Sequence, residues 1–223
     1  MKSSILIALL SIRGIGPKKA NALIRSLPID HETDLASAIE SALSPRLSSQ
    51  QWRSMCIRGE EVVEKTLARG FSVFDIWSTQ FPKRLRRLDS CPLVVFVNGE
   101  PSALSSQLPL AIVGTRNPCT YARERGAVVA GAAASMASSI ISGLAIGCDT
   151  IAHMEALSKD VPTVGVVAHG LDTIYPKENE RLANQIIASG GCLISEYPPG
   201  TPPRPNQFIE RDRIQAGLSQ SGL

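Results

Sequence analysis

The sequence predicts an α/β protein in which a small all-helical domain precedes a doubly wound parallel sheet. Helical patterns fill the chain as far as Gly70, and from Leu108 onward short apolar runs alternate with helical segments. The 223 residues are 43% hydrophobic and 19% charged, which excludes wholesale disorder and allows one large domain or two modest ones. Aromatic residues make up only 4%, a value typical of close-packed α/β layers rich in small residues.

The first 70 residues are expected to form four short helices. Apolar residues at Ile5, Leu6 and Leu9 lie on one face of the first helix, which ends before Gly14. Pro17 stands at a typical first position of the second helix. The third and fourth helices are expected over residues 34–43 and 48–69, the fourth beginning with serine caps and ending at Gly70.

The remainder of the chain is expected to contain a linking region over residues 71–107 and a sheet domain over 108–223. Strands are expected over residues 110–114, 139–142, 163–168 and 192–195, and helices over 121–137, 150–158 and 178–189. Short apolar strands that alternate with helices favour right-handed crossovers and parallel pairing. The three predicted regions are therefore 1–70, 71–107 and 108–223.

Charge and cysteine content restrict the partners and the compartment. Lys and Arg exceed Asp and Glu by 23 to 20, so that contact with nucleic acid would need a local basic patch. The five cysteines are widely spaced and include no CxxC pair, which favours reduced thiols in a cytoplasmic protein and no metal site. Residues 126–148 carry no charge but are rich in Ala, Ser and Gly, so we interpret them as a buried helix and strand and expect no membrane partner.

Gly14-Ile15-Gly16-Pro17-Lys18-Lys19-Ala20 has the form of the turn in a helix-hairpin-helix. Gly14 and Gly16 allow a tight turn, and backbone N–H groups at the start of the next helix are able to hold a phosphate. Lys18 and Lys19 add positive charge beside it. Two interpretations stay open, a DNA contact and a turn that needs glycine only for its geometry.

Two glycine-containing turns follow the first two predicted strands of the sheet. Gly114, Thr115 and Arg116 end the first strand, where a hydroxyl and a guanidinium suit a phosphate group. Gly143 lies in the turn after the second strand, before the helix that carries Asp149. Neither turn is a GxGxxG motif, so the sequence supports no dinucleotide cofactor.

Further cations and one aromatic residue follow the later strands. Lys177, Arg211 and Arg213 are expected near the same edge as Arg116, with Phe208 as a stacking platform. Cations combined with an aromatic ring are typical of sites for single-stranded nucleic acid. Ordinary surface charge around a core phenylalanine is the alternative. No nucleophile with a suitably spaced base is recognisable, so we assign no catalytic residue.

Taken together, these motifs resemble the DprA (Smf) family of DNA-processing proteins in their order and spacing. The matching segments are Gly114-Thr115-Arg116, residues 142–153, Gly170-Leu171-Asp172, Tyr175-Pro176 with Asn179, residues 195–200, Phe208 and residues 211–213. The resemblance covers most of the chain and includes the turn at Gly14 to Ala20. At Asp212 the family commonly has asparagine.

The resemblance implies a Rossmann-like sheet domain after a SAM-like helical domain, and a non-enzymatic protein. Its implied function is to bind and protect incoming single-stranded DNA in natural transformation and to deliver it to the RecA recombinase. By position, Arg116 and Lys177 would hold phosphates and Phe208 would stack on a base. Family members continue beyond Leu223, so the chain is expected to be C-terminally short in the region implied for homodimer formation and for the recombinase contact.

Two other function classes stay open on the sequence alone. One is a Rossmann-fold enzyme that processes nucleotides or nucleoside phosphates, with Asp149, His153 or Glu196 in acid–base roles. The other is a relic without activity.

Overall fold

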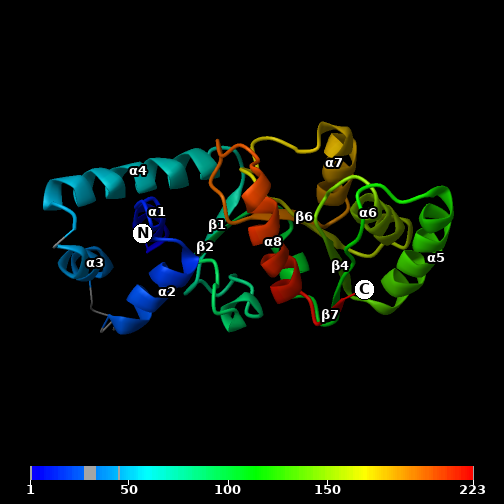
Figure 1. Ribbon diagram of the computed structural model, residues 1–223, viewed down its shortest axis with the longest axis horizontal. Coiled ribbons are helices and arrows are strands. Elements are labelled where there is room, and N and C mark those ends of the chain that lie inside the picture. Colours follow the sequence, from blue (N-terminus) through cyan, green and yellow to red (C-terminus); the bar gives the residue numbers. More distant parts are fainter. Residues whose placement is uncertain (1, 28–33, 45, 223) are drawn as a thin grey trace. The chain divides into compact units, whose positions relative to one another are not determined.

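The computed structural model describes residues 2–27, 34–44 and 46–222 (Figure 1). Contacts within the chain divide it into two compact units. The first comprises Met1–Phe81 with Arg86–Val95, and the second comprises Pro82–Leu85 with Phe96–Leu223. Each unit buries its own set of apolar side chains.

The first unit contains the four helices that the sequence predicts. They are α1 (Lys2–Leu10), α2 (Pro17–Ser26), α3 (Leu35–Leu43) and α4 (Ser49–Leu67). Helix α4 begins with a capping box, in which Ser48 and Gln51 each accept a hydrogen bond from the other's backbone N–H. Helices α1 and α4 pack so closely that a Cβ at Gly59 would overlap the carbonyl of Ser4. A short strand, β1 (Ser72–Asp75), follows.

The turn between α1 and α2 contains the two glycines of the predicted helix-hairpin-helix. Gly14 has φ +86°, a left-handed conformation that favours glycine, and Gly16 is the N-cap of α2. Lys18 and Lys19 are exposed, and the Lys19 ammonium donates to the carbonyl of Gly14 (3.0 Å). DNA contact at this turn stays a prediction.

The sheet of the second unit has the strand order β2-β6-β5-β4-β3-β7. Its strands are β2 (Val94–Gly99), β3 (Pro109–Ala111), β4 (Ser139–Ser142), β5 (Thr163–Val166), β6 (Cys192–Ser195) and β7 (Ser221–Gly222). Strands β3 to β7 pair in parallel, as predicted, but β2 runs antiparallel to β6. The parallel pairing predicted from Leu108 onward is therefore confirmed, and β2, which lies in the predicted linking region, makes the complete sheet mixed. No crossover helix joins β2 to β6, so the handedness rule for strand–helix–strand units leaves its direction free.

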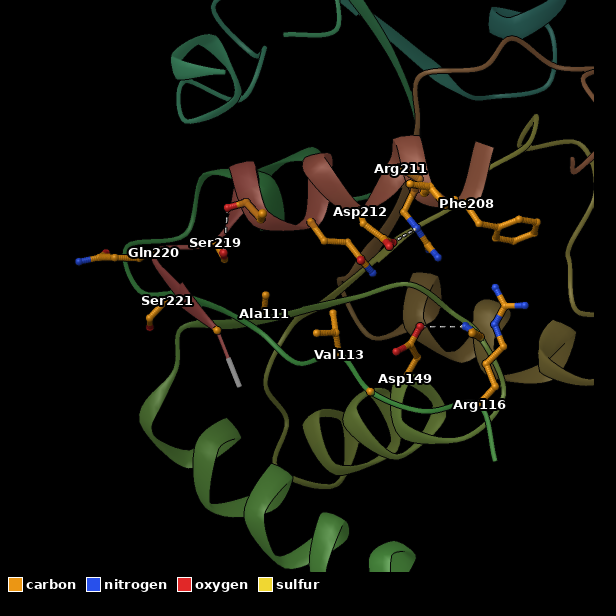
Figure 2. Close-up of a pocket in the computed structure, with 16 residues that line it drawn as sticks. Ala111, Val113, Arg116, Asp149, Phe208, Arg211, Asp212, Ser219, Gln220 and Ser221 are labelled. Carbon is orange, nitrogen blue, oxygen red and sulfur yellow. Dashed lines mark hydrogen bonds and ion pairs between the residues drawn. The ribbon is translucent and has the colours of Figure 1, made fainter. Parts of the chain in front are cut away.

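Helices cover both faces of this sheet. They are α5 (Thr120–Met136), α6 (Cys148–Ser158), α7 (Glu180–Ala188), which follows the 3₁₀ turn η3 (Lys177–Asn179), and α8 (Pro205–Leu218). Figure 2 shows α8 on one side of the strands and α5 and α6 on the other. Two short 3₁₀ turns, η1 (Leu85–Arg87) and η2 (Pro101–Ser105), precede the parallel strands.

Small side chains explain how α5 and α6 pack together. The cluster beneath them is built largely of alanine, with Ala130, Ala133 and Ala134 of α5 against Ala152 and Ala156 of α6. The opposite face of α5 is not buried, in contrast to our expectation for this charge-free segment. It exposes valine and methionine side chains, at Val128, Val129 and Met136.

Two differences from the predicted elements concern the site described below. Strand β3 ends at Ala111, although the apolar run predicts a strand as far as Gly114, so residues 112–114 lie in a loop. No element is predicted from the sequence at α8 or at β7. Within the described part of the chain, none of the helices combines the length and the apolar character that crossing a membrane requires. None of the five cysteines, all of which lie in the described part of the chain, forms a disulfide bond.

Candidate functional site

A cavity of the second unit lies where the strand order reverses. From β3 the chain continues through α5 to β4 on one side, whereas β7 pairs with β3 on the other. Open α/β sheets bind ligands at such a switch point, beyond the carboxyl ends of the strands. Here a cavity of about 700 Å³ lies between the end of β3, strand β7 and helix α8. Figure 2 shows Arg116 and Phe208 at one end of it and Gln220 and Ser221 at the other.

The loop that carries Arg116 is fixed to the start of α6. The carbonyl of Thr115 accepts a hydrogen bond from the backbone N–H of Cys148 (3.1 Å). Gly147 has φ +90°, and a Cβ there would overlap the carbonyls of Thr115 and Arg116, so only glycine fits. At Gly114 a Cβ would lie 2.7 Å from the Cys148 side chain. The exposed Arg116 side chain therefore extends from a closely packed turn.

Gly143, the predicted site residue in the turn after β4, is held in place by side chains of α8. Its carbonyl accepts a hydrogen bond from Nη1 of Arg211 (2.6 Å). With the Gln215 amide oriented to satisfy both of its neighbours, its oxygen accepts from the N–H of Gly143 (2.6 Å) and its nitrogen donates to Asp212 (3.2 Å). Both backbone polar groups of Gly143 are thus bonded to side chains of one helix.

Arg211 is an interior residue, with 4% of its surface exposed. The same Nη1 also donates to the carbonyl of Val166, and Nε donates to Asp212 (3.2 Å). Burial lowers the pKa of Arg211, and the neighbouring carboxylates of Asp212 and Asp149 oppose that shift. The structure gives Arg211 the geometry of a residue that joins β5, α8 and the turn after β4.

Asp149 lies beside this arginine in the first turn of α6. Burial raises the pKa of its carboxyl group, while a hydrogen bond from the N–H of Ala145 (3.2 Å) and the charge of Arg211 act in the opposite direction. The carboxylate lies close to Gly143, since a Cβ at Gly143 would lie 2.6 Å from its Oδ2, and Asp149 also lines the larger cavity. Asp149 therefore helps to hold the turn after β4 by accepting this hydrogen bond from Ala145.

Aromatic rings and cations meet at the mouth of the site. The guanidinium of Arg116 lies 5.0 Å from the ring centre of Phe208, and that of Arg211 lies 6.0 Å from it. The rings of Phe208 and Tyr175 are 5.7 Å apart at 54°. A second, smaller hollow of about 80 Å³ opens here and is lined by Arg116, Gly143, Ala145, Ile146, Tyr175, Pro176 and Phe208.

The structure therefore brings together Gly114, Arg116, Gly143, Phe208 and Arg211, with Thr115 in the same loop. It does not place Lys177 or Arg213 on the walls of either cavity. Lys177 is exposed at the start of η3, next to Pro176 of the smaller hollow. Arg213 forms an ion pair with Glu196, whose side chain is 8% exposed.

Sequence reasoning gives no role to two residues of the site, Tyr175 and Gln215. A signal for Gln215 exists, because Arg211, Ile214, Gln215 and Leu218 have the spacing of a buried helical stripe. The same stripe would have placed Arg211 in the interior. Tyr175 has no comparable signal, since its exposure depends on how its loop lies against Phe208.

The three groups considered for acid–base chemistry all have interior partners. Asp149 accepts from Ala145, and Glu196 is paired with Arg213. His153 is fully buried with Nδ1 2.7 Å from the hydroxyl of Thr163. That hydroxyl donates to the carbonyl of Ile140, so Nδ1 carries the proton. Burial, and secondarily the charge of Arg211, lowers the pKa of His153 to about 3.

Comparison with known proteins places this geometry in a family. Residues 72–223 match the family described as DNA recombination-mediator protein A. The DNA processing protein DprA of Bacillus subtilis is 36% identical over 152 residues, which are 68% of this chain and 51% of that protein. Protein Smf of Escherichia coli is 38% identical over 143 residues, 64% of this chain and 38% of its own length.

Two solved structures are also similar. The X-ray structure of DprA from Streptococcus pneumoniae has a TM-score of 0.65 at 26% identity, and the match covers 93% of this chain and 77% of that one. A structure of DNA processing protein A from Helicobacter pylori, studied for its single-stranded DNA binding mode, has a TM-score of 0.60 at 32% identity. That match covers 68% of this chain and 67% of the other.

The chain spans about half the length of the Bacillus subtilis relative and less of the Escherichia coli one. Its family match nevertheless includes every strand of the sheet and every residue of the site at the switch point. The chain belongs to the DprA/Smf family of DNA recombination mediators.

Proposed function

We propose that this chain binds single-stranded DNA at the carboxyl edge of its sheet, protects it in natural transformation and delivers it to the RecA recombinase. The observation that carries the proposal is the exposed guanidinium of Arg116, held by a rigid turn and lying 5.0 Å from an aromatic ring. A fixed cation beside aromatic surface suits a strand that offers both phosphates and unpaired bases.

Arg116 is assigned the main phosphate contact because its side chain is exposed, whereas Arg211 and Arg213 are bonded within the protein. A guanidinium binds a phosphate through two parallel hydrogen bonds, which an anchored backbone orients well. Lys177 is assigned a second phosphate, as an exposed point charge. Gly114 and Thr115 allow the strand to approach, and Gly143, Arg211 and Arg213 hold the surrounding loops in place.

The comparisons support this proposal through related proteins. The Helicobacter pylori protein is one whose single-stranded DNA binding has been studied, and the family is named for recombination mediation. Delivery to RecA, homodimer formation and cytoplasmic location are proposals drawn from the family. Phosphate contact at Gly14, Gly16, Lys18 and Lys19 of the first unit is a separate part of the proposal.

The proposed activity is binding without chemical turnover. The buried partners of Asp149, His153 and Glu196 give those groups structural roles. An enzyme that processes a small nucleotide would need one of them to reach its substrate.

Titration of a labelled single-stranded oligonucleotide at several salt concentrations, with the same sequence as duplex for control, tests the proposal. We expect tighter binding of the single strand and a steep fall of affinity with salt. Arg116→Ala should weaken binding and reduce the logarithmic salt slope by about 0.7, the value for one phosphate on a single strand. Arg181→Ala, at an exposed arginine of α7, is the matched control.

Two results would contradict the proposal. If the folded chain binds the duplex as tightly as the single strand, its site has no preference for single-stranded DNA. An Arg116→Ala variant with the same affinity and salt slope as the parent would remove Arg116 from the interface. Delivery is tested separately, by asking whether the chain loads RecA onto an oligonucleotide that carries a bound competitor protein.

A further inference from the structure

The exposed aromatic ring at the mouth of the site is that of Tyr175. Its exposed fraction is 47%, while Phe208 is half-buried. Phe208 already has neighbours around its ring, since two guanidinium groups lie within 6.0 Å of its centre and Tyr175 lies at 5.7 Å. Of the two rings, Tyr175 is therefore the one with free surface for a ligand.

A small hollow lies directly beside this tyrosine. Its walls are mainly apolar, and Ile146, on the turn before α6, is as exposed as Tyr175 at 47%. Its volume of about 80 Å³ equals that of roughly three water molecules. The hollow can therefore hold part of one planar ring but cannot enclose a whole nucleotide. Arg116 at its wall adds the one charged group.

We infer that Tyr175 stacks on one unpaired base of the strand, with Ile146 beneath that base and its phosphate at Arg116. This inference rests on the proposed function. Phe208 then acts as a positioning residue, which packs against Tyr175 and Arg116 and fixes the distance between the base site and the phosphate site.

The same geometry implies that the pocket does not distinguish one base from another. The backbone N–H and carbonyl of Gly143, a residue that lines the hollow, are already bonded to Gln215 and Arg211. Stacking is tolerant of sequence because every base has a flat π-face. Oligonucleotides of thymine and of adenine should therefore lose similar affinity when Tyr175 is removed.

An abasic probe separates stacking from a structural role. It keeps the phosphates of the strand but lacks the bases. Tyr175→Ala should weaken binding of the normal oligonucleotide about 5- to 150-fold and leave binding of the abasic one within about twofold of the parent. Tyr175→Phe should bind like the parent. Tyr121→Ala, at an exposed tyrosine of α5, controls for loss of a surface ring.

The outcomes are distinct from failure of the proposed function. If the parent protein binds no single strand, that function itself is wrong. If Tyr175→Ala weakens binding of the normal and the abasic oligonucleotide equally, or weakens binding of neither, Tyr175 is not a stacking residue.

A measurement on the unmodified protein adds an independent test. A fluorescent 2-aminopurine placed at successive positions of the oligonucleotide should be quenched on binding wherever it meets Tyr175. Because the pocket accepts any base, several positions should respond. Absence of quenching at every position would overturn the inference even if the alanine variant fails to fold.

Discussion

Replacing Gly143 by alanine would place a methyl group where the structure has no room for one. Its Cβ would come within 3.0 Å of the ends of three side chains, those of Arg211, Asp149 and Gln215. All three are at least 94% buried and bonded to their surroundings, so they cannot rotate into solvent. The substitution therefore tests whether α8 truly holds the turn after β4.

The cost follows from how the clash can be relieved. Forcing one methyl group into a packed interior costs about 1–3 kcal/mol. If Arg211 moves instead, the carbonyl of Gly143 loses a hydrogen bond from a charged group, which is worth about 1.5–3 kcal/mol. Either route lowers the free energy of unfolding of the second unit by about 1–3 kcal/mol. Binding of single-stranded DNA should weaken as well, because the turn lines the hollow at Arg116.

The assay must report on the second unit. Both tryptophans, Trp52 and Trp77, lie in the first unit, so their fluorescence would miss the change. Amide hydrogen exchange of β4 and β5 measures it directly. Gly126→Ala is the matched control, because a Cβ in that position of α5 meets only Ile151 at 3.9 Å and favours the helix by up to about 1 kcal/mol. If the amides of β4 and β5 are as strongly protected from exchange in Gly143→Ala as in Gly126→Ala, the packing argument is wrong.

Three further substitutions test other parts of the structure. His153 is neutral in the fold but takes a proton in the unfolded chain below pH 6.5, so its contribution to stability is lost as the pH falls from 6.5 towards 3. This loss amounts to about 1.4 kcal/mol of unfolding free energy per pH unit, and His153→Gln should remove it. Acid unfolding followed by circular dichroism measures it, and equal pH dependence of stability in the variant and the parent would contradict the prediction. Asn179 donates a hydrogen bond to the buried carbonyl of Leu144 (2.9 Å), so Asn179→Ala should lower the free energy of unfolding by about 1–3 kcal/mol. Amide hydrogen exchange around that turn should become faster. Unchanged exchange would show that this hydrogen bond does not stabilise the turn. Gly59→Ala would drive a methyl group against the carbonyl of Ser4 and should lower the urea midpoint measured by tryptophan fluorescence, which an unaltered midpoint would refute.

Local signals in the sequence were sufficient for the order and type of most elements. The predicted bounds of β4 and β6 are the observed ones, because each is a run of four buried residues between a helix and a turn. Pro17 is the first residue of α2, and Ser48 caps the start of α4, as their residue types predict. Such signals act over a few residues, so they can be identified without knowledge of the rest of the fold.

Features that depend on distant residues could not be obtained in this way. The antiparallel direction of β2 is decided by its pairing with β6, nearly a hundred residues later in the chain. The spacing of Arg211, Ile214 and Leu218 is a signal for a buried stripe on α8, but its packing over β3, β4 and β5 depends on residues distant in the chain.

The residue pattern alone predicts that cations and an aromatic residue follow the strands of an α/β sheet. Which of these side chains face solvent depends on the packing of the folded chain. Arg116 and Arg211 are the same residue type, but one lies on an exposed loop and the other donates to two backbone carbonyls inside the protein. Burial depends on what the rest of the chain packs against a side chain, and so does the free ring of Tyr175 beside Phe208. Residue type alone carries no record of that packing.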